Sequence, residues 1–171
     1  LSAYSAVNQG HCHPSIVSAM QEQTGKLTLT SRAFYSSNLG KYEQFITEYF
    51  GYDKVLPMNT GAEAVETAIK IARKWAYDVK KVPANAAKII TCTENFHGRT
   101  TTIVSFSTDD DATGGFGPYT PGFEVIPYND LDALREAVAD PNVAGFLVEP
   151  IQGEAGVNVP HDDYIRQAHA I

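Results

Sequence analysis

The fold is decided by residues 54–77, which read KVLPMNTGAEAVETAIKIARKWAY. Val55, Leu56 and Met58 form a short apolar run, and the Asn-Thr-Gly sequence at residues 59–61 is a turn signal that closes it. From position 64 onward, apolar residues recur at 64, 65, 68, 69, 72, 75, 76 and 79, which is a helical period. The stretch therefore predicts a strand, a tight turn and a long helix.

The predicted turn has the properties of an anion site at a helix N-terminus. Thr60 and Glu63 have the T-x-x-E spacing of a capping box, and Gly61 and Ala62 are too small to block a ligand. Backbone N–H groups and the positive end of the helix dipole both favour a phosphate there. The alternative is that Thr60 and Glu63 only cap an ordinary helix, because the turn has neither a Walker lysine nor a complete G-x-G-x-x-G motif.

Composition restricts the class of protein and its partners. The 171 residues are 43% hydrophobic and 19% charged, which is typical of one soluble globular domain. The net charge of −7 argues against nucleic-acid binding, and no apolar run reaches the roughly 18 residues of a membrane span. Cys12 and Cys92 are too few and too far apart for a disulfide framework, which indicates a reducing compartment. We therefore expect small-molecule ligands, no nucleic acid and no membrane.

The remaining chain alternates helices with strands. Helices are predicted after His13, from about 40 to 50, after Asp130 and from about Asp162; strands are predicted at 88–93, 123–128 and 143–148. Residues 109–122 are rich in Gly, Pro and Asp and predict a surface excursion. This order predicts an α/β fold with a mostly parallel sheet flanked by helices. Because the chain begins without methionine and stops within a predicted helix, we expect residues 1–171 to be a partial domain, truncated at both ends.

Three predicted loops follow strands, at residues 59–62, 95–99 and 149–156. Ligands bind at the carboxyl ends of parallel strands, so we expect these loops to converge. His11, Cys12 and His13 suggest a metal site, but no further ligands follow at recognisable intervals, so we predict no metal. The absence of a G-x-S-x-G elbow argues against the commonest serine hydrolases.

Each candidate side chain in these loops has a functional and a structural interpretation. Phe96 either stacks on a planar ligand or packs in the core, and His97 is more simply a hydrogen-bonded loop histidine. Arg99 is either a surface cation or a fork for a substrate carboxylate. Glu149 ends an apolar strand, where a carboxylate must be paired or functional. Glu154 is either solvated or the partner of Arg99.

Several motifs together resemble the class III aminotransferases, which depend on pyridoxal 5′-phosphate, and within that class the ornithine δ-aminotransferases. The motifs are NTGAEA at 59–64, FHGRT at 96–100, EPIQGEAG at 149–156, YSAVNQGHCHP at 4–14, LTLTSRAFY at 27–35 and GFGP at 115–118. They cover essentially the whole chain in family order. The resemblance implies the type I transferase fold, whose large domain has a mostly parallel sheet, and it implies a homodimer. This chain would correspond to the first part of that large domain.

The resemblance also implies roles for individual residues. Gly61 and Ala62 would hold the cofactor phosphate, and Phe96 would lie over the pyridine ring, with His97 and Glu149 also at the cofactor. Tyr4, Arg99 and Glu154 would form the substrate side of the site: Tyr4 would line the pocket, and Arg99 would bind a substrate carboxylate. Glu154 would pair with a second arginine that lies outside this chain, masking it while ornithine binds and releasing it for glutamate. His97 departs from the tryptophan common in animal ornithine aminotransferases.

The implied reaction transfers the δ-amino group of ornithine to 2-oxoglutarate, in the mitochondrial matrix or cytoplasm. Two alternatives stay open: a related class III enzyme acting on acetylornithine or 4-aminobutyrate, and a phosphate-binding or partner-binding domain without catalysis. The lysine that bonds covalently to the cofactor lies downstream in the family, and the last lysine here is Lys88. We therefore predict that residues 1–171 alone have no catalytic residue, no aminotransferase activity and no specific covalent cofactor adduct.

Overall fold

The computed structural model describes residues 3–31 and 33–171. The chain divides into two compact units, Leu1–Leu56 and Pro57–Ile171. Leu1, Ser2 and Arg32, which belong to stretches considered above, lie outside the described residues. Each unit is described by itself.

The first unit contains the helices α1 (Pro14–Thr24) and α2 (Ser37–Phe50). Pro14 stands in the first turn of α1, where a missing N–H costs nothing. The Ser36 hydroxyl accepts the Leu39 N–H and caps α2, and Gly51, with φ 72°, ends it in the left-handed conformation. Both predicted helices are confirmed, and α2 begins three residues before the predicted start.

The second unit is built on a parallel sheet of three strands in the order β2-β1-β3. The strands are β1 (Lys88–Cys92), β2 (Phe123–Ile126) and β3 (Val143–Phe146), and β1 pairs in parallel with both neighbours. The longest helix, α3 (Gly61–Trp75), continues as the π-helical turn η1 (Ala76–Lys80). Helices α6 (Leu131–Val138) and α7 (Tyr164–Ala170) follow β2 and β3, and two one-turn helices, α4 (Thr101–Val104) and α5 (Asp110–Thr113), lie between β1 and β2.

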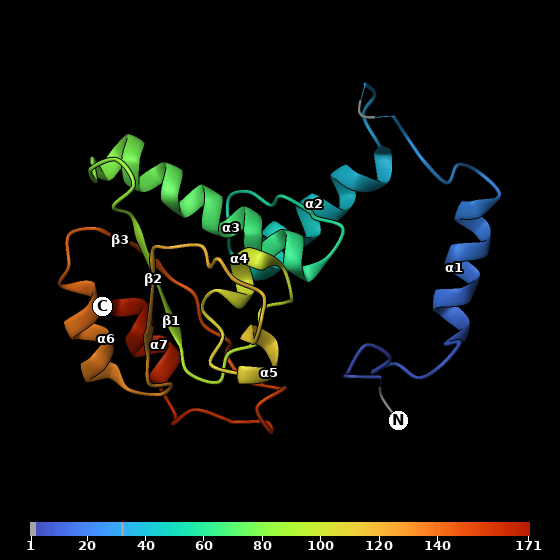
Figure 1. Ribbon diagram of the computed structural model, residues 1–171. Helices are drawn as coiled ribbons and strands as arrows, with labels where there is room; N and C mark the ends of the chain where they lie inside the picture. The colour runs from blue at the N-terminus through green and yellow to red at the C-terminus, as the bar shows by residue number, and fades with distance from the viewer. Residues whose placement is uncertain (1–2, 32) are drawn as a thin grey trace. The chain divides into compact units, whose positions relative to one another are not determined.

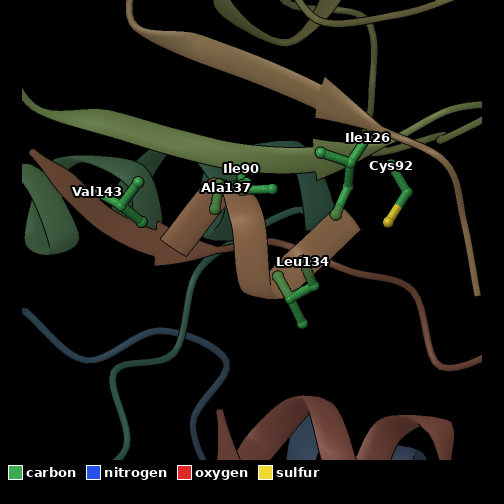
Figure 2. Packing of buried hydrophobic residues seen from close by; sticks show 6 residues of the cluster. All are labelled: Ile90, Cys92, Ile126, Leu134, Ala137 and Val143. Atoms are coloured by element: carbon green, nitrogen blue, oxygen red, sulfur yellow. The ribbon is translucent and has the colours of Figure 1, made fainter. Parts of the chain in front are cut away.

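The core lies on both faces of the sheet because successive side chains of a strand point to opposite faces. Ile90 and Cys92 of β1 pack with Leu134 and Ala137 of α6 (Figure 2). Ile89 packs on the other face with Ile69 of α3 and Ile103 of α4. Figure 1 shows the same layering, with α3 on one side of the strands and α6 and α7 on the other. The predicted parallel α/β sheet with helices on both faces is confirmed.

The predicted strand at residues 55–58 is wrong. This segment has no strand pairing to any described residue and runs irregularly into the start of α3. An apolar run becomes a strand only where a neighbouring strand accepts its hydrogen bonds, and Pro57 lacks an N–H to donate. The excursion at 109–122 also contains α5, and the turn at 100–104 contains α4, neither of which was predicted.

No helix within the described part of the chain combines the length and the hydrophobicity that crossing a membrane requires.

Candidate functional site

A cleft of about 770 Å³ opens beyond the carboxyl end of β1. Its walls include Phe96, His97, Arg99, Asp109, Phe116 and Glu154. This volume is in the range of small-molecule sites, and its place follows the rule that parallel sheets bind ligands at the carboxyl ends of their strands. Residues from two of the three predicted loops thus meet in one cavity.

The third loop forms the start of α3. Thr60 is its N-cap, and its hydroxyl accepts the Glu63 N–H at 3.1 Å. The reciprocal half of the predicted capping box is not formed, because the Glu63 carboxylate accepts instead from the Asn59 side-chain amide at 3.4 Å. A Cβ added at Gly61 would meet no heavy atom within 4 Å. The position of a Gly61 side chain is therefore open, which leaves room for an anion beside the first amides of α3.

Phe96 and Arg99 lie against each other at the cleft. The residue Phe96 is 39% exposed, and the Arg99 guanidinium carbon lies 5.2 Å from the centroid of its ring, within cation–π range. Of the two alternatives for Glu154, the structure does not show the pairing with Arg99: among the described residues, no ion pair joins them. Both side chains nevertheless line the same cavity, so each is open to a charged ligand.

His97 turns inward from the same segment. Its ring packs on Phe106 with centroids 5.9 Å apart, and within the described residues its Nε2 is buried without a hydrogen-bond partner. Burial lowers the pKa of His97, which favours the neutral imidazole. A neutral imidazole can donate or accept one hydrogen bond to a bound ligand at this nitrogen, and it adds no charge to the cavity.

Glu149 follows β3, and its carboxylate binds backbone rather than a cation. Its Oε2 accepts the Phe96 N–H at 3.0 Å. Burial raises the pKa of Glu149, and the nearby Glu154 charge adds to this, while N–H donors from Phe96 and Gly153 oppose it. The Glu149 carboxylate is therefore paired, as expected, but with backbone amides. Through the Phe96 amide it connects the loop after β3 to the turn that carries Phe96.

The loop at 149–156 is held in place by two other side chains. Buried Gln152 donates from Nε2 to the Thr93 carbonyl at 2.7 Å, just beyond β1. The Tyr128 hydroxyl is 3.2 Å from the carbonyls of both Glu149 and Pro150. These contacts hold the loop against the residues that follow β1 and β2, and Glu154 of this loop lines the cleft.

The remaining candidates are not part of the cleft wall. Gly61 and Ala62 do not line it, although Gly98 packs against Ala62 from the cleft side of the turn. Tyr4 belongs to the first unit, where it is 93% exposed. The roles predicted for these residues therefore stay predictions.

Sequence analysis missed Glu66, which lies one turn into α3. Its Oε1 accepts the Thr100 hydroxyl at 2.5 Å, the short limit of the range for hydroxyl–carboxylate hydrogen bonds. The only sequence signal was Thr100 itself, which precedes a short helix-forming run and caps it by accepting the Ile103 N–H. Nothing in the spacing of Glu66 indicated that it faces a loop more than thirty residues away.

A parallel sheet that places a helix N-terminus, an aromatic ring and an arginine near one cleft is the arrangement of an α/β enzyme domain. The whole chain, residues 1–171, matches the family model described as aminotransferase class-III. The chain therefore belongs to the class III aminotransferases.

Relatives within this class share most of the sequence. Mitochondrial ornithine aminotransferase of Drosophila melanogaster is 61% identical over all 171 residues, which cover 40% of that protein. The crystal structure of Toxoplasma gondii ornithine aminotransferase, described as showing partial occupancy of PLP at its active site, matches with a TM-score of 0.96 and 56% identity, covering 99% of this chain and 40% of that one. Acetylornithine aminotransferase of Elizabethkingia anophelis matches with a TM-score of 0.81 and 64% identity, covering 99% of this chain and 41% of that one. The chain thus spans about two fifths of the length of these relatives.

Proposed function

We propose that the protein to which this chain belongs is an ornithine δ-aminotransferase dependent on pyridoxal 5′-phosphate. The observation that carries the proposal is 61% identity to an ornithine aminotransferase across the entire chain. We also propose that residues 1–171 form part of its large domain, that it acts as a homodimer, and that it works in the mitochondrial matrix or the cytoplasm.

The residues present fit the cofactor. The space around Gly61 leaves room for a phosphate at the N-terminus of α3, where the first backbone amides and the helix dipole favour a dianion. The exposed part of the Phe96 ring offers a flat apolar surface for a planar ring. The unpartnered Nε2 of His97 is a buried polar atom that a ligand could satisfy. In this proposal Gly61, Ala62, Phe96, His97 and Glu149 make the cofactor side of the site.

When bound, pyridoxal phosphate supplies the electron-withdrawing ring through which an amino group is exchanged. The protein orients the reactants and supplies charge. Arg99 binds a substrate carboxylate through its planar fork, and the Phe96 ring beneath it limits the positions that the guanidinium can take. Glu154 offers a carboxylate at the same cleft, suited to the second amino group of a diamino acid or to a second arginine. Tyr4 is proposed to contact the substrate.

A second candidate is an acetylornithine aminotransferase. It is favoured by the 64% identity to the enzyme of that name from Elizabethkingia anophelis. The cleft residues described here do not distinguish the two substrates, because both carry the carboxylate that Arg99 would bind.

The test is an amino-donor panel on the purified full-length protein. L-ornithine, N-acetylornithine and 4-aminobutyrate are each offered with 2-oxoglutarate, and glutamate formation is measured. We expect kcat/KM for ornithine to exceed the other values by at least roughly a hundredfold, since a site built for a polar group rejects analogues that lack it. A higher value for N-acetylornithine would replace the first candidate with the second, and no transfer from any donor would remove both.

A further inference from the structure

We propose that Glu66 is a positioning residue for Arg99 and that it acts through Thr100. The inference rests on the proposed function, since it concerns how the carboxylate-binding arginine is held. In this proposal α3 has two roles: its N-terminus forms the proposed phosphate site, and its Glu66 holds the turn that carries Arg99.

The turn that carries Arg99 is tethered at both ends. At its start, the Phe96 N–H donates to the Glu149 carboxylate at 3.0 Å. At its end, the Thr100 hydroxyl donates to Glu66 at 2.5 Å. Arg99 lies directly before the second tether, so the direction in which its side chain leaves the backbone depends on where Thr100 is held.

The second tether also connects two helices. Glu66 belongs to α3, while Thr100 caps α4 by accepting the Ile103 N–H at 3.2 Å. Glu66 and Thr100 are both half-buried, so their bond is less exposed to competition from water than a surface pair would be. A hydrogen bond to a charged acceptor is among the stronger kinds found in proteins.

Packing reinforces this connection in the middle of the turn. A Cβ added at Gly98 would lie 3.0 Å from Ala62 Cβ and 2.9 Å from Ile103 Cδ1, so the backbone of the turn lies directly on α3 and α4. The turn is therefore fixed against the helix whose N-terminus is the proposed phosphate cradle. The distance between that cradle and Arg99 is then set within one rigid helix, from Gly61 to Glu66.

This geometry makes Glu66 relevant to substrate binding although it does not line the cleft. Loss of its carboxylate frees the Thr100 hydroxyl and loosens the backbone beside Arg99. The cradle at Gly61 is untouched, because it depends on Thr60 and on the first amides of α3. Affinity for a substrate carboxylate should fall, while affinity for the cofactor should not, because the Phe96 end of the turn keeps its own hydrogen bond to Glu149.

The experiment compares four variants of the full-length protein with the parent. Glu66→Ala removes the acceptor, Glu66→Gln keeps an oxygen in its place, and Thr100→Val removes the donor. Glu136→Ala is the matched control, because Glu136 is an exposed glutamate on α6 away from the cleft. Hydrogen exchange is measured on the peptide that spans residues 94–104, and binding of 2-oxoglutarate and of pyridoxal phosphate is measured by titration.

We expect Glu66→Ala to raise exchange in that peptide and to weaken 2-oxoglutarate binding, each by roughly tenfold, as one lost charge-assisted hydrogen bond implies. Glu66→Gln should stay within about threefold of the parent, since a neutral bond of the same geometry is weaker but present. Glu136→Ala should match the parent in both. Cofactor affinity should be unchanged in all of them.

Two results would overturn the proposal. One is unchanged exchange and unchanged 2-oxoglutarate affinity in Glu66→Ala; the other is an equal loss of cofactor affinity, which would mean a general structural role. If Glu66→Ala does not fold, Thr100→Val replaces it, together with a fifth variant that carries both Thr100→Val and Glu66→Gln. Both variants lose the α4 cap, so the double variant should match Thr100→Val if Glu66 acts only through Thr100. A parent protein that fails to bind 2-oxoglutarate would count against the proposed function, while the exchange data would still decide whether the tether holds the turn.

Discussion

Replacing Gly98 with alanine tests whether the turn after β1 is packed as tightly on α3 as the structure indicates. Gly98 has φ +131°, a conformation that residues with a side chain rarely adopt. Forcing alanine into it costs about 1–3 kcal/mol. The new methyl group would lie 2.9 Å from Ile103 Cδ1 and 3.0 Å from Ala62 Cβ, and such overpacking costs another ~1–3 kcal/mol. The expected loss for Gly98→Ala is therefore about 2–6 kcal/mol.

Gly115→Ala is the matched control for this substitution. Gly115 also has a positive φ, +81°, but an added Cβ would meet nothing within 4 Å. Only the backbone cost of about 1–2 kcal/mol should remain there. Urea denaturation of the full-length proteins, followed by circular dichroism, gives the apparent free energy of unfolding of each. If Gly98→Ala costs no more than Gly115→Ala, the close contact between the turn and α3 does not exist in solution.

Four further substitutions test the site itself. Gly61→Asp should weaken pyridoxal phosphate binding by roughly a hundredfold, because it places a carboxylate beside a dianion. The control Gly40→Asp, at an exposed position of α2, should leave the cofactor affinity unchanged. Equal cofactor affinities in the two variants would show that Gly61 does not lie at the phosphate. Arg99→Lys should reduce kcat/KM by about tenfold to a hundredfold, because lysine cannot make the bidentate contact with a carboxylate. Glu154→Ala should shift the preference of the enzyme toward α-amino groups. An unchanged ratio of the half-reaction rates with ornithine and with glutamate would contradict this effect of Glu154→Ala. Burial lowers the pKa of His97 below its value in the unfolded chain, so the contribution of the neutral side chain to stability is present at pH 7 and is lost as the pH falls below about 6.5. The free energy of unfolding, measured from pH 8 to pH 5, should therefore decline less in His97→Gln than in the parent. Parallel pH dependences in the two proteins would refute this expectation.

The sequence by itself determined which segments alternate and where the chemistry lies along the chain. The helical period after position 64 predicted α3, and buried apolar runs predicted β1, β2 and β3, because burial and periodicity leave a direct trace in composition. The motifs at 96–100 and 149–156 marked residues that do meet at one cleft, since parallel strands bring their carboxyl ends together.

Local pattern failed where structure depends on a partner that is distant in sequence. The run at 55–58 is as apolar as a strand, yet it is not one in the described structure, because no neighbour pairs with it. The spacing of Thr60 and Glu63 predicted a reciprocal capping box, but the Glu63 carboxylate accepts from the Asn59 side-chain amide instead. Several donors lie within reach of a surface carboxylate, so local spacing does not determine which of them it binds.

Only the tertiary structure decided how the site is held together. Glu149 and Glu66 lie far apart in sequence, yet their carboxylates hold the two ends of one turn, through the Phe96 amide and the Thr100 hydroxyl. Neither contact has a spacing rule, because each depends on the distance between a helix and a loop that the packing of the sheet sets. Periodicity reports which face of an element is buried, whereas a single hydrogen bond between elements is determined by the position of both in space.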